Sequence, residues 1–275
     1  MGSTESKLEN IDTCARLVAE AAGRGARIVL LPEKWNALGS PEVLLINAEE
    51  LEDGLSVAAM VGWARQHRIV LVGGSITERA ADGRLFNTSM VFDETGAVRA
   101  VYRKIHMFDA NVGGHEFRES ASEAPGAEIV TCDVGGWRLG LSICYDVRFP
   151  ELYRILALRG AQLLTVPANF TLFTGRDHWE LLLRARAVED QCFVLAAGQL
   201  ISAATGPPSH GRSMIIDPWG VVMAQASDRE MVVLAEVDPR LIADVREKVP
   251  ALANRRPLSY AWPTEATEPG ITFTG

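Results

Sequence analysis

The segment 140–153, Gly-Leu-Ser-Ile-Cys-Tyr-Asp-Val-Arg-Phe-Pro-Glu-Leu-Tyr, decides how the chain is expected to fold. Residues 137–143 are short, apolar and glycine-flanked, which predicts a buried strand. Residues 149–158 predict a helix, because Pro150 stands at an early position where its missing N–H costs nothing. Cys144 falls between them, on a strand-to-helix turn where backbone N–H groups can surround a nucleophile. A free cysteine is more often simply a buried apolar residue.

Outward from this segment, helices alternate with strands, and hairpins interrupt the alternation. Helices are expected at 7–22, 55–66, 176–190 and 239–248, and strands at 27–31, 69–75, 161–166, 192–197 and 231–237. Hairpins are expected from 87–92 with 98–102 and from 211–217 with 221–225, and a long polar loop over 111–125. The pattern predicts an α/β protein with one or two mixed sheets faced by helices.

Composition narrows the class of protein. The net charge of −8 argues against nucleic acid or an anionic membrane as partner. No apolar run approaches the ~18 residues of a membrane span, and no leader pattern opens the chain. The four cysteines are widely spaced, as expected of reduced thiols in the cytoplasm rather than of disulfides or a zinc site. We expect one domain over residues 1–263 and a mobile tail over 264–275.

Three chemically useful side chains follow predicted strands. Glu33 comes after the strand at 27–31, and Lys104, one of four lysines, after the second strand of the first hairpin. A loop carboxylate and a surface lysine are the ordinary alternatives. Together with Cys144 they suit acyl transfer: a carboxylate takes the thiol proton, and an ammonium stabilises a thiolate and an oxyanion. The backbone N–H of Tyr145 would be a second oxyanion donor. A Cys–His pair is the commoner arrangement, but no histidine stands in a local motif that supports it.

Three ordered motifs carry a family resemblance: Pro32-Glu33 after an apolar strand, Tyr102-Arg103-Lys104-x-His106, and Cys144-Tyr145-Asp146-x-Arg148-Phe149-Pro150-Glu151. They resemble the nitrilase superfamily of carbon–nitrogen hydrolases over about residues 7–260. Further segments, at 178–180, 184–187 and 213–220, look like the Nit branch, which includes ω-amidase and the amidase of deaminated glutathione.

The resemblance implies a four-layer α-β-β-α sandwich of two mixed sheets, commonly dimerised through helices beside the cysteine. It implies that Cys144 forms a thioester, that Glu33 is the general base, and that Lys104 stabilises the tetrahedral intermediate. The family often has a second glutamate that orients the lysine. We match it to Glu119 in preference to Glu116. No metal or organic cofactor is expected.

The substrate is expected to be a small amide. The resemblance implies that Arg148 binds a substrate carboxylate, together with the region of Phe170 and Thr174. The alternative is a structural arginine paired with Asp146 or Glu151. The rival functions are nitrile hydrolysis, N-carbamoyl hydrolysis, an inactive binding relative and a Cys–His thiol hydrolase.

The chain departs from the family pattern in two places. Relatives carry a strand before the first helix, whereas only residues 1–6 precede that helix here, so we expect a gap and an exposed sheet edge. The chain is truncated at its start, or another segment fills the place. Residues 209–212, Ser-His-Gly-Arg, stand where relatives often show Tyr-Gly-His, so substrate preference near that loop is expected to differ.

Overall fold

The computed structural model describes residues 1–200 and 208–259, and every element named below lies in these ranges. The helices are α1 (Lys7–Gly23), α2 (Pro41–Asn47), α3 (Leu55–His67), α4 (Pro150–Leu158), α5 (Leu172–Asp190) and α6 (Pro239–Lys248), with 3₁₀ turns η1 (Glu119–Ala121), η2 (Cys144–Arg148) and η3 (Pro257–Ser259). The strands are β1 (Ile28–Leu30), β2 (Val70–Val72), β3 (Ile76–Arg79), β4 (Leu85–Phe92), β5 (Val98–Arg103), β6 (Asp109–Val112), β7 (His115–Arg118), β8 (Thr131–Val134), β9 (Trp137–Leu141), β10 (Leu163–Ala168), β11 (Phe193–Gly198), β12 (Met214–Ile216) and β13 (Val222–Gln225).

The first sheet is organised around β4, whose eight residues are all buried. Strands β2 and β3 pair with successive parts of one edge of β4, and β5 pairs with the other edge. These pairings are antiparallel, whereas β1 adds to β2 in parallel. The chain leaves the sheet at Pro32, just before Glu33, and the Pro32 carbonyl accepts from the Ser75 N–H beyond the end of β2.

The second sheet has the order β13-β12-β11-β10-β9-β8. Its centre, β9-β10-β11, is parallel, and its outer strands are antiparallel. Strands β10 and β11 are largely apolar and buried, as parallel strands covered on both faces should be. Both sheets are therefore mixed, as the alternating pattern predicts.

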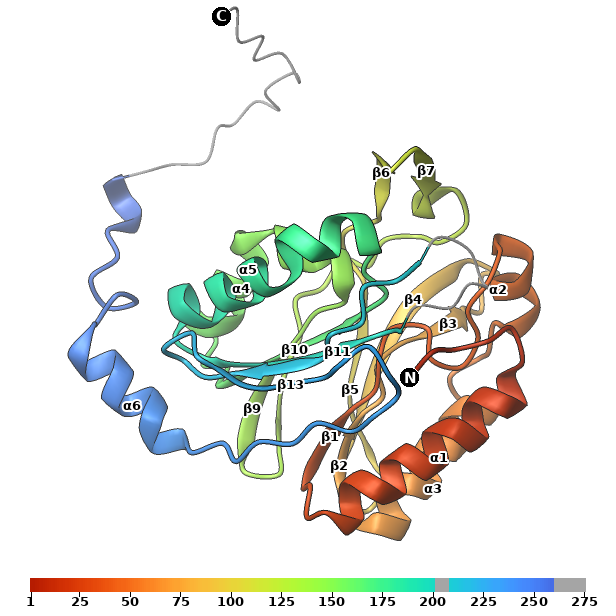
Figure 1. The fold of residues 1–275 in the computed structure, drawn as a ribbon, viewed down its shortest axis with the longest axis horizontal. Helices are drawn as coiled ribbons and strands as arrows, with labels where there is room; N and C mark the ends of the chain where they lie inside the picture. The colour runs from red at the N-terminus through yellow and green to blue at the C-terminus, as the bar shows by residue number, and fades with distance from the viewer. Residues whose placement is uncertain (201–207, 260–275) are drawn as a thin grey trace, which may run out of the picture.

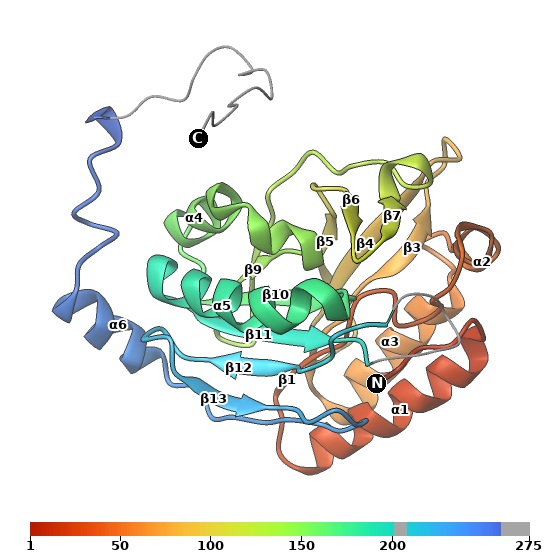
Figure 2. The same ribbon diagram turned by 45° about the horizontal axis from the view of Figure 1, so that its top comes forward.

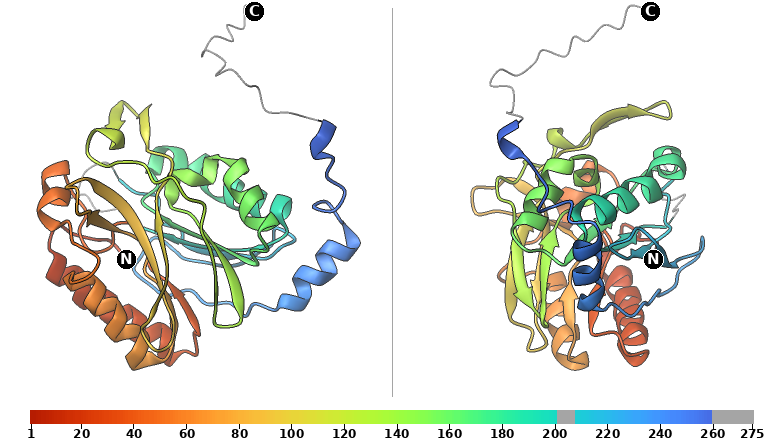
Figure 3. Two further views of the ribbon diagram at one scale, coloured as in Figure 1. Left: turned by 180° about the vertical axis from the view of Figure 1, so that it is seen from behind. Right: turned by 90° about the vertical axis from the view of Figure 1, so that its left-hand side faces the viewer.

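Helices lie on the outer faces of the two sheets (Figures 1 and 3). Helices α1 and α3 cover the first sheet, and α4 and α5 cover the second, while the inner faces of the sheets approach one another. One apolar cluster fills the space between the sheets and beneath α4 and α5, and another lies beneath α1 and α3. The arrangement brings the ends of β1, β5 and β9 to the same region of the molecule. None of the helices in the described ranges is long and apolar enough to span a membrane.

The expected loop over residues 111–125 is partly wrong. It contains most of a two-stranded hairpin, β6–β7, which turns at Gly113 and Gly114, with φ of 60° and 79°. Two consecutive residues at positive φ favour a tight hairpin turn, which glycine permits without strain. Figure 2 shows this hairpin above β4 and near α2. The structure also contains α2, β3 and β8, which the sequence pattern did not predict.

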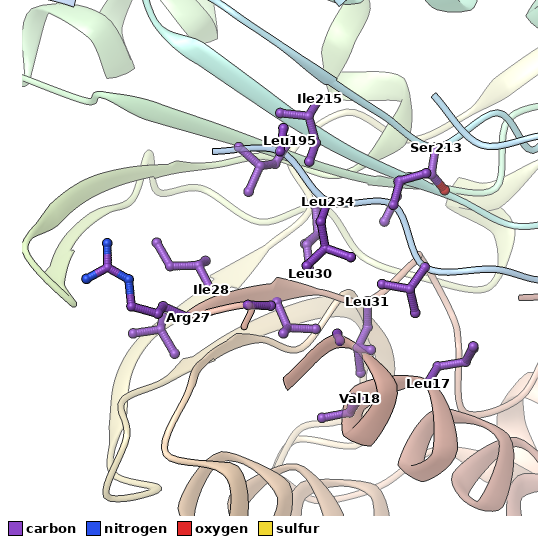
Figure 4. Close-up of a pocket in the computed structure, with 18 of the residues that line it drawn as sticks. Leu17, Val18, Arg27, Ile28, Leu30, Leu31, Leu195, Ser213, Ile215 and Leu234 are labelled. Carbon is purple, nitrogen blue, oxygen red and sulfur yellow. The ribbon is translucent and has the colours of Figure 1, made fainter. Parts of the chain in front are cut away.

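The expected strand over residues 231–237 is wrong. This segment forms no strand, and it lines a cavity of about 630 Å³ together with β1, β11, β12 and the C-terminal end of α1. Figure 4 shows apolar side chains around the cavity, among them Leu30 of β1, Leu195 of β11 and Leu234. An apolar segment becomes a strand only beside a hydrogen-bonding neighbour, and within the described residues this one has none.

Strand β1 has an open edge beside the same cavity. Within the described residues it pairs only with β2, and residues 1–6 form no strand on its other side. Among the described residues, β1 therefore has the unpaired edge that was expected. The tail expected over 264–275 lies outside the described residues.

Candidate active site

The ends of three strands converge on one cavity of about 640 Å³. Glu33 follows β1, Lys104 follows β5, and Cys144 follows β9 by two residues. All eight side chains proposed from the sequence line this cavity: Glu33, Lys104, Glu119, Cys144, Tyr145, Arg148, Phe170 and Thr174. The β6–β7 hairpin contributes Phe117 and His115 to its wall.

Lys104 is the centre of a buried charge network. Its Nζ donates to Glu33 Oε1 at 3.1 Å and to both carboxylate oxygens of Glu119 at 2.7 and 2.8 Å. Burial by itself would lower the pKa of Lys104, but the charges of Glu119 and Glu33 outweigh it and raise the pKa well above its usual value. The side chain is therefore an ammonium at neutral pH.

Glu33 is fixed through both oxygens. Oε1 also accepts from Asn87 Nδ2 at 2.8 Å, and Oε2 accepts from the backbone N–H of Asn169 at 2.6 Å. Asn87, on β4, reaches Glu119 Oε1 as well, at 3.3 Å. Sequence reasoning missed Asn87, although a polar amide in an otherwise buried strand is a detectable signal. The fixed carboxylate faces the cavity in one orientation.

Glu119 rather than Glu116 joins the network. Glu119 Oε2 accepts from the backbone N–H of Phe108 at 2.7 Å. Burial opposes its ionisation, but the ammonium groups of Lys104 and Lys34 outweigh burial and lower the pKa of Glu119 to about 2. Glu116 is exposed and pairs with Arg118 at 2.7 Å. The preference for Glu119 thus agrees with the geometry.

Cys144 begins the short turn η2 in the left-handed region, with φ of 49°. This conformation is uncommon for a residue with a side chain and is typically found where the surroundings fix it, often at functional sites. Burial first, and then the negative charge of Glu33, raise the pKa of the Cys144 thiol well above its usual value, while Lys104 acts in the opposite direction. The thiol is therefore protonated at neutral pH and needs a base to become a nucleophile.

Asp146 joins the turn that carries Cys144 to the strand that carries Lys104. Its Oδ2 accepts from Ile143 N at 2.8 Å and from the Tyr102 hydroxyl at 2.7 Å. Its Oδ1 accepts from His106 N at 3.1 Å and lies 2.7 Å from the ring Nδ1 of His106. The His106 ring stacks on Phe149, with centroids 3.6 Å apart. Asp146 of the cysteine motif therefore binds both Tyr102 and His106 of the lysine motif.

Arg148 lies half-buried on the cavity wall without a carboxylate partner among the described residues. Asp146 is occupied by Tyr102 and His106, so the structural alternative of an Arg148–Asp146 pair is wrong. The guanidinium instead lies 5.0 Å from the centroid of the Phe170 ring and 3.2 Å from His178 Nδ1. Its charge is available to an anion in the cavity.

Among the hydrogen bonds of the described residues, none joins a histidine to Cys144, and His115 is the histidine on the cavity wall. In the described ranges, no group of three or more His, Cys, Asp or Glu side chains is arranged to hold a metal ion. The charged groups that act on the Cys144 thiol are the Lys104 ammonium and the carboxylates of Glu33 and Glu119.

The loop at residues 209–212 borders the cavity at one point. The Ser209 hydroxyl donates to Asn169 Oδ1, and Ser209 lines the cavity. Arg212 lies away from it and pairs with Asp228 at 2.6 Å. The contribution of this loop to the wall therefore comes from a serine.

Comparisons with known proteins place the chain in a family. The carbon–nitrogen hydrolase family model matches residues 1–247. The omega-amidase NIT2 of Homo sapiens is 40% identical over 256 residues, covering 93% of this chain and 92% of that protein. The deaminated glutathione amidase of Synechocystis sp. is 38% identical over 266 residues, covering 93% and 95%.

Solved structures agree with these matches. The crystal structure of the C. elegans NitFhit protein superposes with a TM-score of 0.87 at 36% identity. The match covers 95% of this chain and 64% of that one, so this chain spans less than two thirds of NitFhit. The chain belongs to the carbon–nitrogen hydrolase family of the nitrilase superfamily and is an amidase-type hydrolase with an active-site cysteine.

Proposed function

We propose that the protein hydrolyses the amide of a small carboxylated or 2-oxo acid, through a thioester on Cys144, with release of ammonia. The observation that carries this proposal is the convergence of Glu33, Lys104 and Glu119 beside Cys144, in a cavity whose wall holds Arg148, which has no carboxylate partner among the described residues. The names of the omega-amidase and deaminated glutathione amidase relatives point to the same class of substrate.

The first half-reaction transfers the acyl group to sulfur. Glu33 takes the thiol proton of Cys144 as Sγ attacks the amide carbon, and the carbonyl oxygen becomes an oxyanion. Lys104 and the Tyr145 N–H donate to that oxyanion, because charge developing in a buried site needs fixed donors. Glu33 then passes the proton to nitrogen as the C–N bond breaks, so that ammonia leaves and the thioester remains.

The second half-reaction returns the thiol. Glu33 removes a proton from a water molecule, whose oxygen attacks the thioester carbon. The new oxyanion meets the same donors and collapses, the C–S bond breaks, and the proton held by Glu33 returns to the sulfur of Cys144. Each turnover consumes one amide and one water and yields one carboxylic acid and one ammonia. Glu119 keeps Lys104 in place throughout.

The electrostatics of the wall favour a substrate with a second anionic end. Burial lowers the pKa of Arg148 because its charge is incompletely solvated, so a substrate carboxylate would supply a missing counter-charge. A planar guanidinium binds a carboxylate through two parallel hydrogen bonds. Phe170 and Thr174 lie on the same wall and would contact the acyl chain.

Ammonia release across a panel of amides tests this function. Monoamides of dicarboxylic and 2-oxo acids should be turned over, and Cys144→Ala should give the blank rate. Arg148→Ala should lose far more activity on carboxylated amides than on neutral ones, whereas Arg176→Ala, an exposed arginine off the cavity, should lose none. Equal losses on both substrate types would refute the role of Arg148. Turnover of a nitrile or an N-carbamoyl compound, but of no amide, would assign the site to those reactions instead.

We also propose that the layers seen in Figure 1 are the four-layer sandwich of the family, and that two chains associate through α4 and α5. These helices expose the large apolar side chains Ile155, Leu158, Leu181 and Val188. Exposed apolar patches of this kind mark interfaces. Light scattering should give twice the 29.9 kDa chain mass, and Leu181→Glu should reduce it to one chain. The four unpaired cysteines support a cytoplasmic location.

A further inference from the structure

A second buried lysine–glutamate pair lies beside the site, and the mechanism above does not use it. Lys34 Nζ lies 2.8 Å from Glu123 Oε2 and 3.8 Å from Glu119 Oε1. The Glu123 side chain is fully buried, and Thr77 donates to its other oxygen at 3.4 Å. Buried charges are costly unless they are paired, so this pair has a definite place in the fold.

The backbone holds Lys34 on the side of the cavity. Lys34 follows Glu33 directly and lies in the left-handed region, with φ of 49°. Its N–H donates to the Ser75 hydroxyl at 3.0 Å, and the next N–H, of Trp35, donates to the Ser75 carbonyl at 3.3 Å. Disfavoured conformations of this kind persist where the surrounding structure fixes them. As a result, two consecutive residues, Glu33 and Lys34, both line the cavity.

Lys34 also holds the turn that carries Glu119. The N–H of Glu123 donates to the carbonyl of Glu119 at 3.0 Å, so the two glutamates lie on one turn of chain. Lys104 binds the first glutamate of this turn, and Lys34 binds the second. Movement of this turn would displace the carboxylate that orients Lys104.

In the proposed reaction Lys104 has competing partners, and a second ammonium beside Glu119 would relieve this competition. Lys104 donates to both Glu33 and Glu119, and in the proposed reaction it must also donate to an oxyanion. Its hydrogen bonds to Glu119 weaken at that moment. Lys34 lies within ion-pair distance of Glu119, and the proposed reaction does not need it to bind the oxyanion.

We propose that Lys34, held by Glu123, is a positioning residue of the amidase site: it supplies Glu119 with a second ammonium, so that Lys104 can turn to the reacting carbonyl. This inference rests on the proposed function and deepens it. Lys34 acts through Glu119 and Lys104 and need not touch the substrate.

The test compares variants that remove one or both charges of the pair. Lys34→Met should lower kcat by about 10–100-fold with little change in KM, as loss of a supporting residue typically does. Glu123→Gln keeps the Lys34 ammonium, so it should lower thermal stability but keep most of kcat. Lys34→Met with Glu123→Met removes both charges and should recover stability, because buried pairs can be replaced by apolar residues, without recovering kcat.

Two further readouts separate positioning from a purely structural role. Without Lys34, the pKa of Glu119 should rise, because one of its two cations is gone, and the acidic limb of the kcat profile should move to higher pH. Lys7→Met is the matched control: Lys7 pairs with the buried Glu49 at 2.5 Å and does not line the cavity. This control should lose stability without a change in kcat or pH profile.

The outcomes are distinct. Equal losses of kcat in Lys34→Met and Glu123→Gln, or a double variant with wild-type kcat, would overturn the inference and leave the pair as a structural contact. A wild-type enzyme that releases ammonia from no amide would overturn the proposed function itself, and the inference with it. Low kcat in Lys34→Met and in the double variant, with kcat retained in Glu123→Gln, would support the inference.

Discussion

Replacement of Asp146 by asparagine should uncouple the cysteine turn from the lysine strand. The carboxylate is wholly buried and receives Ile143 N and the Tyr102 hydroxyl on one oxygen, and the His106 backbone and ring on the other. Asparagine keeps one acceptor oxygen and puts an NH₂ group, itself a donor, in place of the second. Whichever way the amide turns, one backbone N–H, of Ile143 or of His106, loses its acceptor, and the other contact on that oxygen becomes a weaker, neutral hydrogen bond.

The expected destabilisation follows from those two contacts. A hydrogen bond to a charged group contributes about 1.5–3 kcal/mol, so the loss of one such bond and the weakening of another should cost roughly 2–4 kcal/mol. For a chain of this size, about 1 kcal/mol corresponds to roughly 2–4 °C in Tm, so the Tm should fall by at least about 4 °C. Cys144 starts the turn next to Ile143, and a displacement of about 1 Å can cost on the order of 10²-fold in kcat.

Thermal unfolding and steady-state ammonia release measure the two effects. Asp133→Asn is the matched control, because Asp133 is exposed and its contact to Arg138 is 3.7 Å long. It should leave both Tm and kcat unchanged. An Asp146→Asn variant with a Tm within about 2 °C of wild type would refute the argument that this carboxylate holds the two motifs together.

Three other perturbations have outcomes fixed by the charges of the molecule. Lys104→Met should slow the alkylation of Cys144 by iodoacetamide by about tenfold or more at a given pH, because the Lys104 ammonium favours the thiolate. Peptide mass mapping measures the rate of alkylation, and an unchanged rate would contradict this role of Lys104. The pKa of Glu119 is about 2 in the folded state, below its usual value of 4.5. Ionised Glu119 therefore adds about 3 kcal/mol to the free energy of unfolding above pH 4.5, and this contribution is lost as the pH falls toward 2. In Glu119→Gln, the free energy of unfolding measured with denaturant should depend less on pH over that range. An unchanged dependence on pH would count against the pairing of Glu119 with the two lysines. Burial raises the pKa of Asp190 to about 7, so its ionisation increasingly opposes folding from pH 3.8 up to 7. Asp190→Asn should therefore add about 2–4 kcal/mol to the free energy of unfolding at pH 8 and little at pH 4. Equal effects at both pH values would contradict this.

The positions of Glu33, Lys104 and Cys144 at strand ends could be predicted, because Glu33 and Cys144 follow short apolar runs and Lys104 follows the second strand of a hairpin. The contacts among them could not. Asn87 bridges Glu33 and Glu119 from a strand far away in the sequence, and Lys34 meets Glu123 across 89 positions. Such pairings depend on how the sheets pack, which local patterns do not encode.

The errors in the expected elements have local and long-range causes. The hairpin β6–β7 was detectable, since two adjacent glycines between extended polar residues are a turn signal. Residues 231–237 have the composition of a strand, but a strand also requires a neighbour, and whether one is present is a property of the whole chain.

The open edge of β1 has a consequence for amide hydrogen exchange. The Arg27 carbonyl accepts from Val70, and the Leu31 N–H donates to Val72, so the odd-numbered residues of this stretch bond to β2. Backbone groups of a strand alternate in direction, so the N–H groups of Ile28 and Leu30 face the cavity instead. Deuterium should therefore enter β1 at every second position, with Ile28 and Leu30 labelled long before Val29 and Leu31.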